Sequence, residues 1–425
     1  MSPGDIHPAL RGRLGIGIGS VGGGGEIPGI HPGLSRHLSA GGQGGGIGTA
    51  PAGGRPATQM RGQPLMRRGT HARVCVIDRA LTAFLSMDFG VRQQQQQQQQ
   101  EARQVVILGA GRDTSYLRYL AGELIGGASD QSESSTTRQQ RHHRTVRWYE
   151  VDQLGVIKTK LELLRACPNV NVEVARSGTN EASPSYALRV RLKNGDDNTA
   201  AAASPGSDDM DTESSLLPYH LIGHDLRLPP SHLFASLQSS HHGFDPSVPT
   251  LFVMECVQMY MPESSAMSLL TAISSMCGAN ALLALYDPIL GSDGFGRVME
   301  QHLTRAGVVA PPAKDSNDQL CLTARRTLDS QLDRLVGCGW NTVVGCDMLA
   351  AYDTVVEAEQ RRKANTVEML DEVEEWVLIM RHYCFVVAGV STPATNDSNI
   401  AQQFCSVGKP PFGFVEARCS VRSST

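Results

Sequence analysis

Short runs of apolar residues that end at a glycine or an acidic residue recur through the middle of this chain. The first run, Val105–Leu108, is followed by Gly109, Ala110 and Gly111. Later runs occupy 146–152, 219–226, 250–257 and 281–287. Runs of this length between turn residues are typical of buried parallel strands. The pattern therefore predicts an α/β sheet whose first strand leads into a glycine turn.

Segments with helical periodicity lie between these runs. The clearest covers 66–87, with a predicted entry turn at 67–70 and apolar residues at helical spacing after that turn. Those residues are Ala72, Val76, Ile77, Ala80, Leu81, Phe84 and Leu85. Further helices are predicted at 115–121, 154–165, 262–276, 295–306 and 327–337, with two last strands at 340–347 and 380–388. Alternation of strands and helices favours a layered α/β domain.

Other segments have no such pattern, which lowers the number of domains expected from 425 residues. Residues 1–65 are glycine-rich, so we expect them to be disordered. Polar low-complexity inserts are predicted near 93–100, a run of glutamines, and near 126–145 and 177–215. The tail at 391–425 is expected to be loop-like. One domain is therefore predicted over 66–390.

Acidic residues at the ends of the runs indicate where the sheet would bind a ligand. They are Asp152, Asp225, Glu255 and Asp287. The carboxyl ends of parallel strands share one edge, and α/β sheets bind ligands there. Without the insert at 126–145, Asp152 stands where an acid would bind a ribose diol. A nucleoside-type ligand is predicted, but Thr114 replaces the third glycine of the dinucleotide fingerprint, which disfavours a nicotinamide oxidoreductase.

Charge and cysteine content narrow the classes of partner and site that this protein could have. A net charge of −4 gives no reason to expect nucleic acid or an anionic membrane as partner. The ten cysteines include no C-x-x-C pair, so we expect reduced thiols and no metal site. No apolar run reaches the length of a membrane span, and no signal-peptide core is present. We expect a monomer in the cytoplasm, with a nuclear location also compatible.

Six short blocks, in order, resemble the leucine carboxyl methyltransferase family. They are Leu108–Thr114, Tyr149–Asp152, Ile222–Arg227, Glu255–Met261, Phe295–Met299 and Met380–Cys384. The resemblance covers roughly 66–390 without the inserts. It implies the class I methyltransferase (Rossmann-like) fold, a seven-stranded mostly parallel sheet with flanking helices and an antiparallel seventh strand. It also implies S-adenosyl-L-methionine as cofactor and the C-terminal leucine carboxylate of the type 2A protein phosphatase catalytic subunit as substrate, a methylation that regulates phosphatase assembly.

The resemblance assigns roles to residues of these blocks by match. Gly109 would lie against the methionine part of the cofactor, and Asp152 would bind the ribose hydroxyls. Asp225 and Leu226 would contact the adenine, and Glu255 is a further cofactor contact.

Two more residues are implied at the reacting groups. Arg73 matches an arginine that contacts the cofactor carboxylate, and Tyr260 is similar to a tyrosine that lines the methyl-transfer site. We predict that Arg73 and Tyr260 hold the acceptor carboxylate, with Val257, Met259 and Met261 as the apolar wall for a leucine side chain. The alternatives are a core role for Tyr260 and a solvated helix charge for Arg73.

Two other functions stay open at this stage. In the family a cofactor-contacting lysine precedes the helix at 66–87, but here Arg36 stands in a glycine-rich segment. A protein that binds the cofactor without turnover is therefore one alternative. The tRNA wybutosine-synthesising paralogue shares these blocks but continues into a β-propeller, for which about 35 residues after Gly389 leave no room. We therefore rank the paralogue lower.

Overall fold

The computed structural model describes residues 64–87, 102–124, 146–177, 185–193, 219–306, 320–324, 326–390, 401, 404 and 416–419. The glycine-rich segment 1–63, the glutamine run and the insert near 126–145 lie outside these residues. What the sequence predicts for those three segments stays a prediction.

The described strands form one ten-stranded sheet in the order β10-β8-β9-β7-β6-β1-β2-β5-β4-β3. Their bounds are β1 Arg103–Leu108, β2 Val146–Asp152, β3 Val170–Ser177, β4 Ser185–Leu192, β5 Tyr219–Gly223, β6 Thr250–Glu255, β7 Ala281–Pro288, β8 Thr342–Asp347, β9 Tyr383–Gly389 and β10 Glu416–Cys419. β5, β2, β1, β6 and β7 are parallel neighbours, and β9 runs antiparallel between β7 and β8. The central seven strands, β5 to β8, therefore have the class I methyltransferase arrangement that the family resemblance implies.

The direction in which the chain adds new strands to the sheet reverses at β1. From β1 the chain adds β2 and then β5 on one side, and later adds β6 and β7 on the other. Connections on the two sides leave the carboxyl edge in opposite directions, so the edge between β1 and β6 is free of crossing chain. Ligands of open α/β sheets bind at such a reversal.

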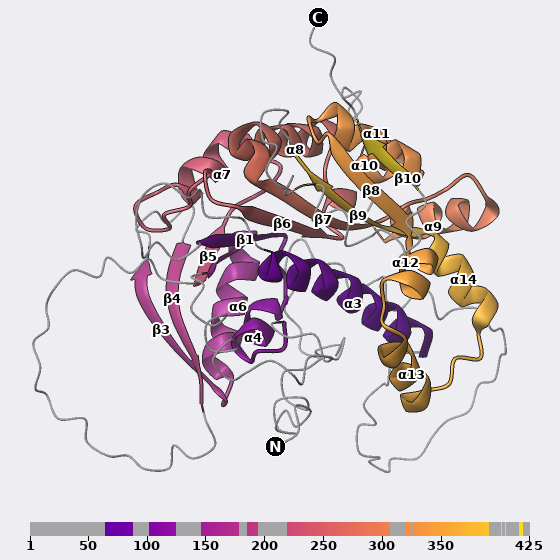
Figure 1. Cartoon of the computed structure of the whole chain (residues 1–425), viewed down its shortest axis with the longest axis horizontal. Coiled ribbons are helices and arrows are strands. Elements are labelled where there is room, and N and C mark those ends of the chain that lie inside the picture. Colours follow the sequence, from indigo (N-terminus) through magenta and orange to yellow (C-terminus); the bar gives the residue numbers. More distant parts are fainter. Residues whose placement is uncertain are drawn as a thin grey trace, which may run out of the picture.

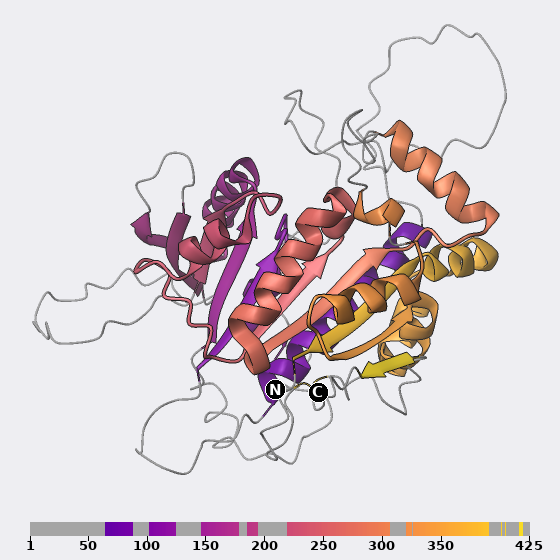
Figure 2. The same ribbon diagram turned by 90° about the horizontal axis from the view of Figure 1, so that it is seen from above.

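Helices cover both faces of the sheet (Figure 1). Their bounds are α3 Pro64–Ser86, α4 Ser115–Leu120, α6 Leu154–Ala166, α7 Pro230–Leu237, α8 Glu263–Cys277, α9 Gly294–Arg305, α10 Cys321–Ala324, α11 Leu328–Gly337, α12 Met348–Thr354, α13 Ala358–Val367 and α14 Val373–Arg381, with 3₁₀ turns η1 Gln258–Tyr260 and η2 Gly278–Asn280. Alternate residues of the central strands face two separate cores. One face of the sheet is covered by α3, α4, α6, α12 and α14. The other face, which is the near side in Figure 2, is covered by α7, α8 and α11.

The helix predicted at 66–87 is α3, and the apolar residues predicted for its buried stripe are all buried. It begins at Pro64, however, so the turn predicted at 67–70 is wrong. Arg68 explains the difference, because its guanidinium donates to the backbone oxygens of Ala364 and Glu368 and thereby ties the first turns of α3 to α13. This tertiary contact, made with residues 296 and 300 positions away, extends the helix.

Three strands lie beyond the predicted seven. β4 falls inside 177–215, so the prediction of a polar insert is wrong for 185–192. Leu188, Val190 and Leu192 alternate with Arg189 and Arg191 there, a period-two strand pattern obscured by the polar sequence on both sides. The tail is predicted to be loop-like, but residues 416–419 form strand β10. Met380 and Arg381, which are predicted to start the last strand, instead end helix α14.

Candidate functional site

The glycine turn after β1 has the backbone that only glycine adopts readily. Gly109 and Gly111 have φ of 74° and 47°, values that cost other residues about 1–2 kcal/mol. The N–H of Gly109 donates to the Val151 oxygen at 2.8 Å, which fixes the turn against β2. A Cβ on Gly109 would meet Val257 Cγ2 at 2.4 Å, whereas a Cβ on Gly111 would have no neighbour within 4 Å. Gly109 therefore packs against protein, and the open space of the turn lies at Gly111.

Asp152, the last residue of β2, faces that open space. Its carboxylate accepts a hydrogen bond from the Gly111 N–H at 2.7 Å and one from the Gln153 N–H at 2.6 Å. Burial raises the pKa of Asp152, and the two backbone donors oppose the shift. The structure thus brings the predicted ribose acid and the glycine turn into direct contact.

Asp225 and Leu226 follow the end of β5 beside Asp152. The backbone N–H of His224 donates to the backbone carbonyl oxygen of Asp152 at 2.8 Å, which joins the two strand ends. Asp225 is partly exposed and pairs with Arg227 at 2.6 Å, and the hydrogen bond from the Arg227 side chain lowers the pKa of Asp225. Leu226 is half-buried against the core that contains Val151 and Ile222. A partly exposed acid next to an apolar side chain is suited to one edge and one face of a purine ring.

Glu255 ends β6 on the other side of the glycine turn and pairs with Arg73 of α3. The Nε of Arg73 lies 2.6 Å from Oε1 of Glu255. Burial raises the pKa of Glu255, and the arginine opposes that shift. Arg73 is also 5.8 Å from the centre of the Tyr286 ring. It is therefore half-buried in an ion pair, and the alternative of a solvated helix charge is wrong.

Tyr260 lies on η1, just beyond β6, and is 50% exposed. The alternative of a core tyrosine is therefore wrong. Burial of part of the ring raises the pKa of its hydroxyl, and nearby Arg73 opposes the shift. Arg73, Glu255 and Tyr260 thus gather at one end of the carboxyl edge, and Asp152 and Asp225 at the other.

Two sequence predictions about this edge are wrong. Asp287, the fourth strand-end acid, is only 1% exposed, and its carboxylate accepts from the backbone N–H groups of Gln258 and Met259 instead of facing a ligand. Val257, Met259 and Met261 are all buried, so they do not form an exposed apolar wall beside Tyr260. Each packs into the protein because η1 folds back over the end of β7.

Sequence reasoning missed a second charged group next to Glu255. Asp78 of α3 forms an ion pair with Arg118 of α4, and Arg118 also donates to Ser115, whose hydroxyl donates to Asp113. Burial raises the pKa of Asp78, and Arg118 opposes the shift. Both residues influence the pKa of Glu255. Asp78 lies five positions after Arg73 on α3, a spacing that does not bring two side chains to one helix face, so the sequence carried no signal for this contact.

These residues meet the chemical demands of S-adenosyl-L-methionine. The cofactor needs acceptors for a ribose diol, charged partners for an amino-acid end and a partly apolar place for adenine. Asp152 beside the open space at Gly111 would supply the first, Glu255 with Arg73 the second, and Asp225 with Leu226 the third. The donor set and the open turn therefore fit the cofactor.

Within the part of the chain that the structure describes, no three His, Cys, Asp or Glu side chains gather in a way that could hold a metal ion. Among the same residues, no helix is long and apolar enough to cross a membrane.

Comparison with known proteins agrees with this geometry. The family model described as leucine carboxyl methyltransferase matches residues 136–274. Leucine carboxyl methyltransferase 1 of Aspergillus fumigatus is 27% identical over 360 residues, which is 81% of this chain and 77% of that protein. Its Schizosaccharomyces pombe counterpart is 24% identical over 340 residues, 78% of this chain and 84% of that protein. The tRNA wybutosine-synthesizing protein 4 of Rattus norvegicus is 27% identical over 329 residues, 77% of this chain but 39% of that protein.

The family match, the relatives along most of the chain and the strand order agree with one another. Together with the donor set at the carboxyl edge, they show an S-adenosyl-L-methionine-dependent methyltransferase that is similar to the leucine carboxyl methyltransferases.

Proposed function

We propose that this protein methylates the C-terminal leucine carboxylate of a type 2A protein phosphatase catalytic subunit and thereby regulates phosphatase assembly. The observation that carries the proposal is the meeting of the Arg73–Glu255 ion pair and the half-exposed Tyr260 at one end of the carboxyl edge. A cation and a hydroxyl are the donors that a free main-chain carboxylate needs. The names of the fungal relatives support the same acceptor.

The remaining cofactor contacts follow the geometry of the edge. We assign Asp152 to the ribose hydroxyls, Asp225 and Leu226 to the adenine, and Glu255 with Arg73 to the amino-acid end. Gly109 shapes the turn beside the methionine part, since any side chain there would collide with Val257.

The reaction needs little acid or base help from the protein. The cofactor, when bound, supplies an electrophilic methyl group on a sulfonium. The acceptor carboxylate is already ionised at pH 7, because the usual pKa of a chain-terminal carboxyl is about 3.3–3.7. The task of Arg73 and Tyr260 is to hold the acceptor oxygen in line and away from water. Positioning of this kind can supply roughly 7–11 kcal/mol of the barrier.

The test is transfer of a tritiated methyl group to three phosphatase catalytic subunits that differ only at the last residue. We expect full methylation of the form that ends in leucine and weaker methylation of the form that ends in alanine, because a lost apolar contact of that size costs about 1.5–3 kcal/mol. The form that ends in leucine amide is the matched control and should not react, since it lacks the ionised nucleophile. Methylation of the amide form at the rate of the acid would overturn the proposal.

A second candidate follows from the similarity to the rat wybutosine-synthesizing protein, of which the chain spans 39%. Transfer of label to tRNA in place of the phosphatase would favour it. Binding of the cofactor without transfer to either acceptor would favour the alternative of a binding protein without turnover.

A further inference from the structure

The turn that carries Tyr260 cannot set its own geometry. η1 has three residues, and such a short 3₁₀ segment gains little from its own hydrogen bonds. Its internal bonds are those from Tyr260 N to the Val257 oxygen at 3.1 Å and from Met261 N to the Gln258 oxygen at 2.9 Å. The residue just after Glu255, Cys256, has a φ of 54°, a strained value for a residue with a side chain. The position of Tyr260 must therefore be imposed by neighbours.

The neighbours act through Gln258, the first residue of η1, which is completely buried. Its side-chain oxygen accepts from the Nη2 of Arg334. Its amide nitrogen lies 3.4 Å from the sulfur of Met254 on β6. Its backbone N–H, with that of Met259, donates to the carboxylate of Asp287. Both ends of the side chain and the backbone of Gln258 are thus fixed.

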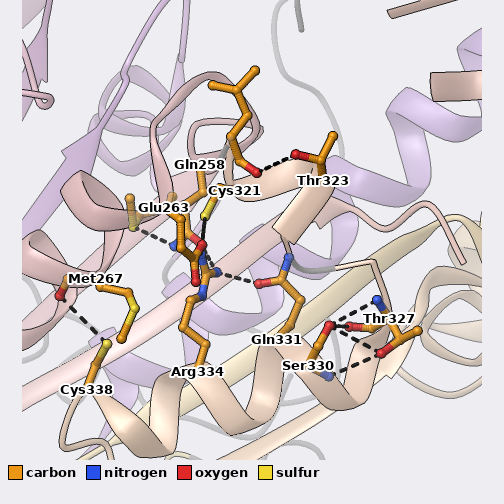
Figure 3. Close-up of polar contacts among 12 residues, drawn as sticks. Gln258, Glu263, Met267, Cys321, Thr323, Thr327, Ser330, Gln331, Arg334 and Cys338 are labelled. Atoms are coloured by element: carbon orange, nitrogen blue, oxygen red, sulfur yellow. Dashed lines mark hydrogen bonds and ion pairs between the residues drawn. The ribbon is translucent and has the colours of Figure 1, made fainter. Parts of the chain in front are cut away.

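Arg334 connects this residue to three helices. It comes from α11, is 1% exposed, and also donates to Cys321 of α10 and Gln331 of its own helix. Glu263 at the start of α8 lies 3.6 Å away. Figure 3 shows these side chains around the guanidinium. A buried arginine is costly unless it is paired, and the partner that leads towards the site is Gln258.

We propose that Gln258, held by Arg334 and Asp287, is the positioning residue for Tyr260. The inference rests on the proposed function, because it gives Tyr260 its task at the acceptor carboxylate. Gln258 points away from the exposed side of the turn and touches no reacting group. It acts by fixing the turn two residues before the tyrosine, so that the hydroxyl meets the acceptor oxygen with little freedom.

The chain offers a matched control in Gln331. Gln258 and Gln331 are both buried glutamines, and each accepts from the same Nη2 of Arg334. Only Gln258 belongs to η1. Gln258→Leu and Gln331→Leu therefore remove the same kind of bond from the same arginine, and both should lower the thermal unfolding midpoint. Only the first should disturb Tyr260.

We expect Gln258→Leu to lower kcat for phosphatase methylation roughly ten- to hundredfold, because small misplacements of a reacting group have effects of this size. KM for S-adenosyl-L-methionine should stay within about twofold, and Gln331→Leu should keep kcat within about threefold. Gln258→Glu, which preserves an acceptor for Arg334, should restore most of the rate.

In a Tyr260→Phe background the added effect of Gln258→Leu should fall below about threefold, since the hydroxyl that it positions is gone. Equal losses in the two leucine variants, or a full effect of Gln258→Leu without the tyrosine hydroxyl, would overturn the inference.

A measurement without turnover separates this inference from the proposed function. The ring resonances of Tyr260 in protein with isotope-labelled tyrosine should shift or broaden in Gln258→Leu and stay unchanged in Gln331→Leu. Unchanged resonances in both variants would refute the positioning role, whatever the acceptor is. An inactive wild-type protein with the expected pattern of resonances would instead count against the proposed function alone.

Discussion

At the scale of a single residue, Asp152 combines a structural contact with a position that is open to a ligand. Its carboxylate holds the Gly111 and Gln153 N–H groups, and it faces the open space of the glycine turn. Two backbone donors do not fill the roughly four acceptor positions of a carboxylate. Remaining acceptor capacity beside an open space is what a ribose diol requires.

Replacement of Asp152 by alanine should therefore weaken S-adenosyl-L-methionine binding at least about tenfold, since a hydrogen bond to a charged group contributes about 1.5–3 kcal/mol. Asp152→Asn keeps one acceptor oxygen and should show an intermediate loss. Calorimetric titration measures both. Asp245→Ala is the control, because Asp245 accepts from the Ser247 N–H at 2.8 Å but precedes β6, at the opposite edge of the sheet. A folded Asp152→Ala protein with unchanged affinity would remove this residue from the site.

At the scale of elements, the ends of β1 and β6 form one unit. The turn after β1 places Gly109 against Val257 of the segment after β6, and Cys256 in that segment donates its N–H to the Tyr286 oxygen of β7 at 2.8 Å. The cofactor side and the Tyr260 side of the edge are thereby joined through packed backbone. We therefore expect a change in one turn to affect the other.

Alanine at Gly109 should consequently destabilise the protein by more than alanine at Gly111. Both changes force a side chain into the left-handed region, at about 1–2 kcal/mol, but only Gly109→Ala also collides with Val257. Denaturant unfolding should show the difference, and Val257→Ala added to Gly109→Ala should recover part of it. Equal stabilities of the two glycine variants would mean that the collision is relieved without cost.

At the scale of the whole molecule, the seven-stranded sheet is extended by β3, β4 and β10, of which β4 and β10 lie in segments predicted to be polar or loop-like. β4 pairs with β5 and β3 on its two sides, and β3 has β4 as its neighbour at the end of the strand order. Leu188 and Val190 of β4 are buried. The segment 177–215 therefore combines a structural strand with polar sequence on either side.

Two deletions should separate these parts. Removal of 126–145 and 194–215 should leave the thermal unfolding midpoint unchanged or slightly higher, because closure of a shorter loop costs less entropy. Removal of all of 177–215 should lower the midpoint by several degrees, since β3 loses its partner and a buried apolar face becomes exposed. A large drop after the first deletion would show that those polar segments stabilise the fold.

Local patterns determined most of the architecture. Apolar runs between turn residues predicted strands β1, β2, β5, β6 and β7, and helical periodicity predicted α3 and α6, because burial on a sheet or helix imposes a spacing that sequence records directly. The same logic placed the acids of β2, β5 and β6 at one edge, since parallel strands share a carboxyl end. The positions of Asp152 and Glu255 at that edge were predictable for this reason.

Tertiary structure decided what depends on contacts between distant segments. Asp287 at the end of β7 has the same kind of sequence position as Asp152. In the structure, however, η1 folds over Asp287, whose carboxylate accepts hydrogen bonds from backbone N–H groups of η1. The pairing of Arg73 with Glu255 joins residues 182 positions apart in the printed sequence, and no local pattern encodes it. Gln258 became a candidate only when α11 placed Arg334 beneath it. Periodicity records which side of an element is buried, whereas the direction of a particular polar side chain is set by the partner that packs against it.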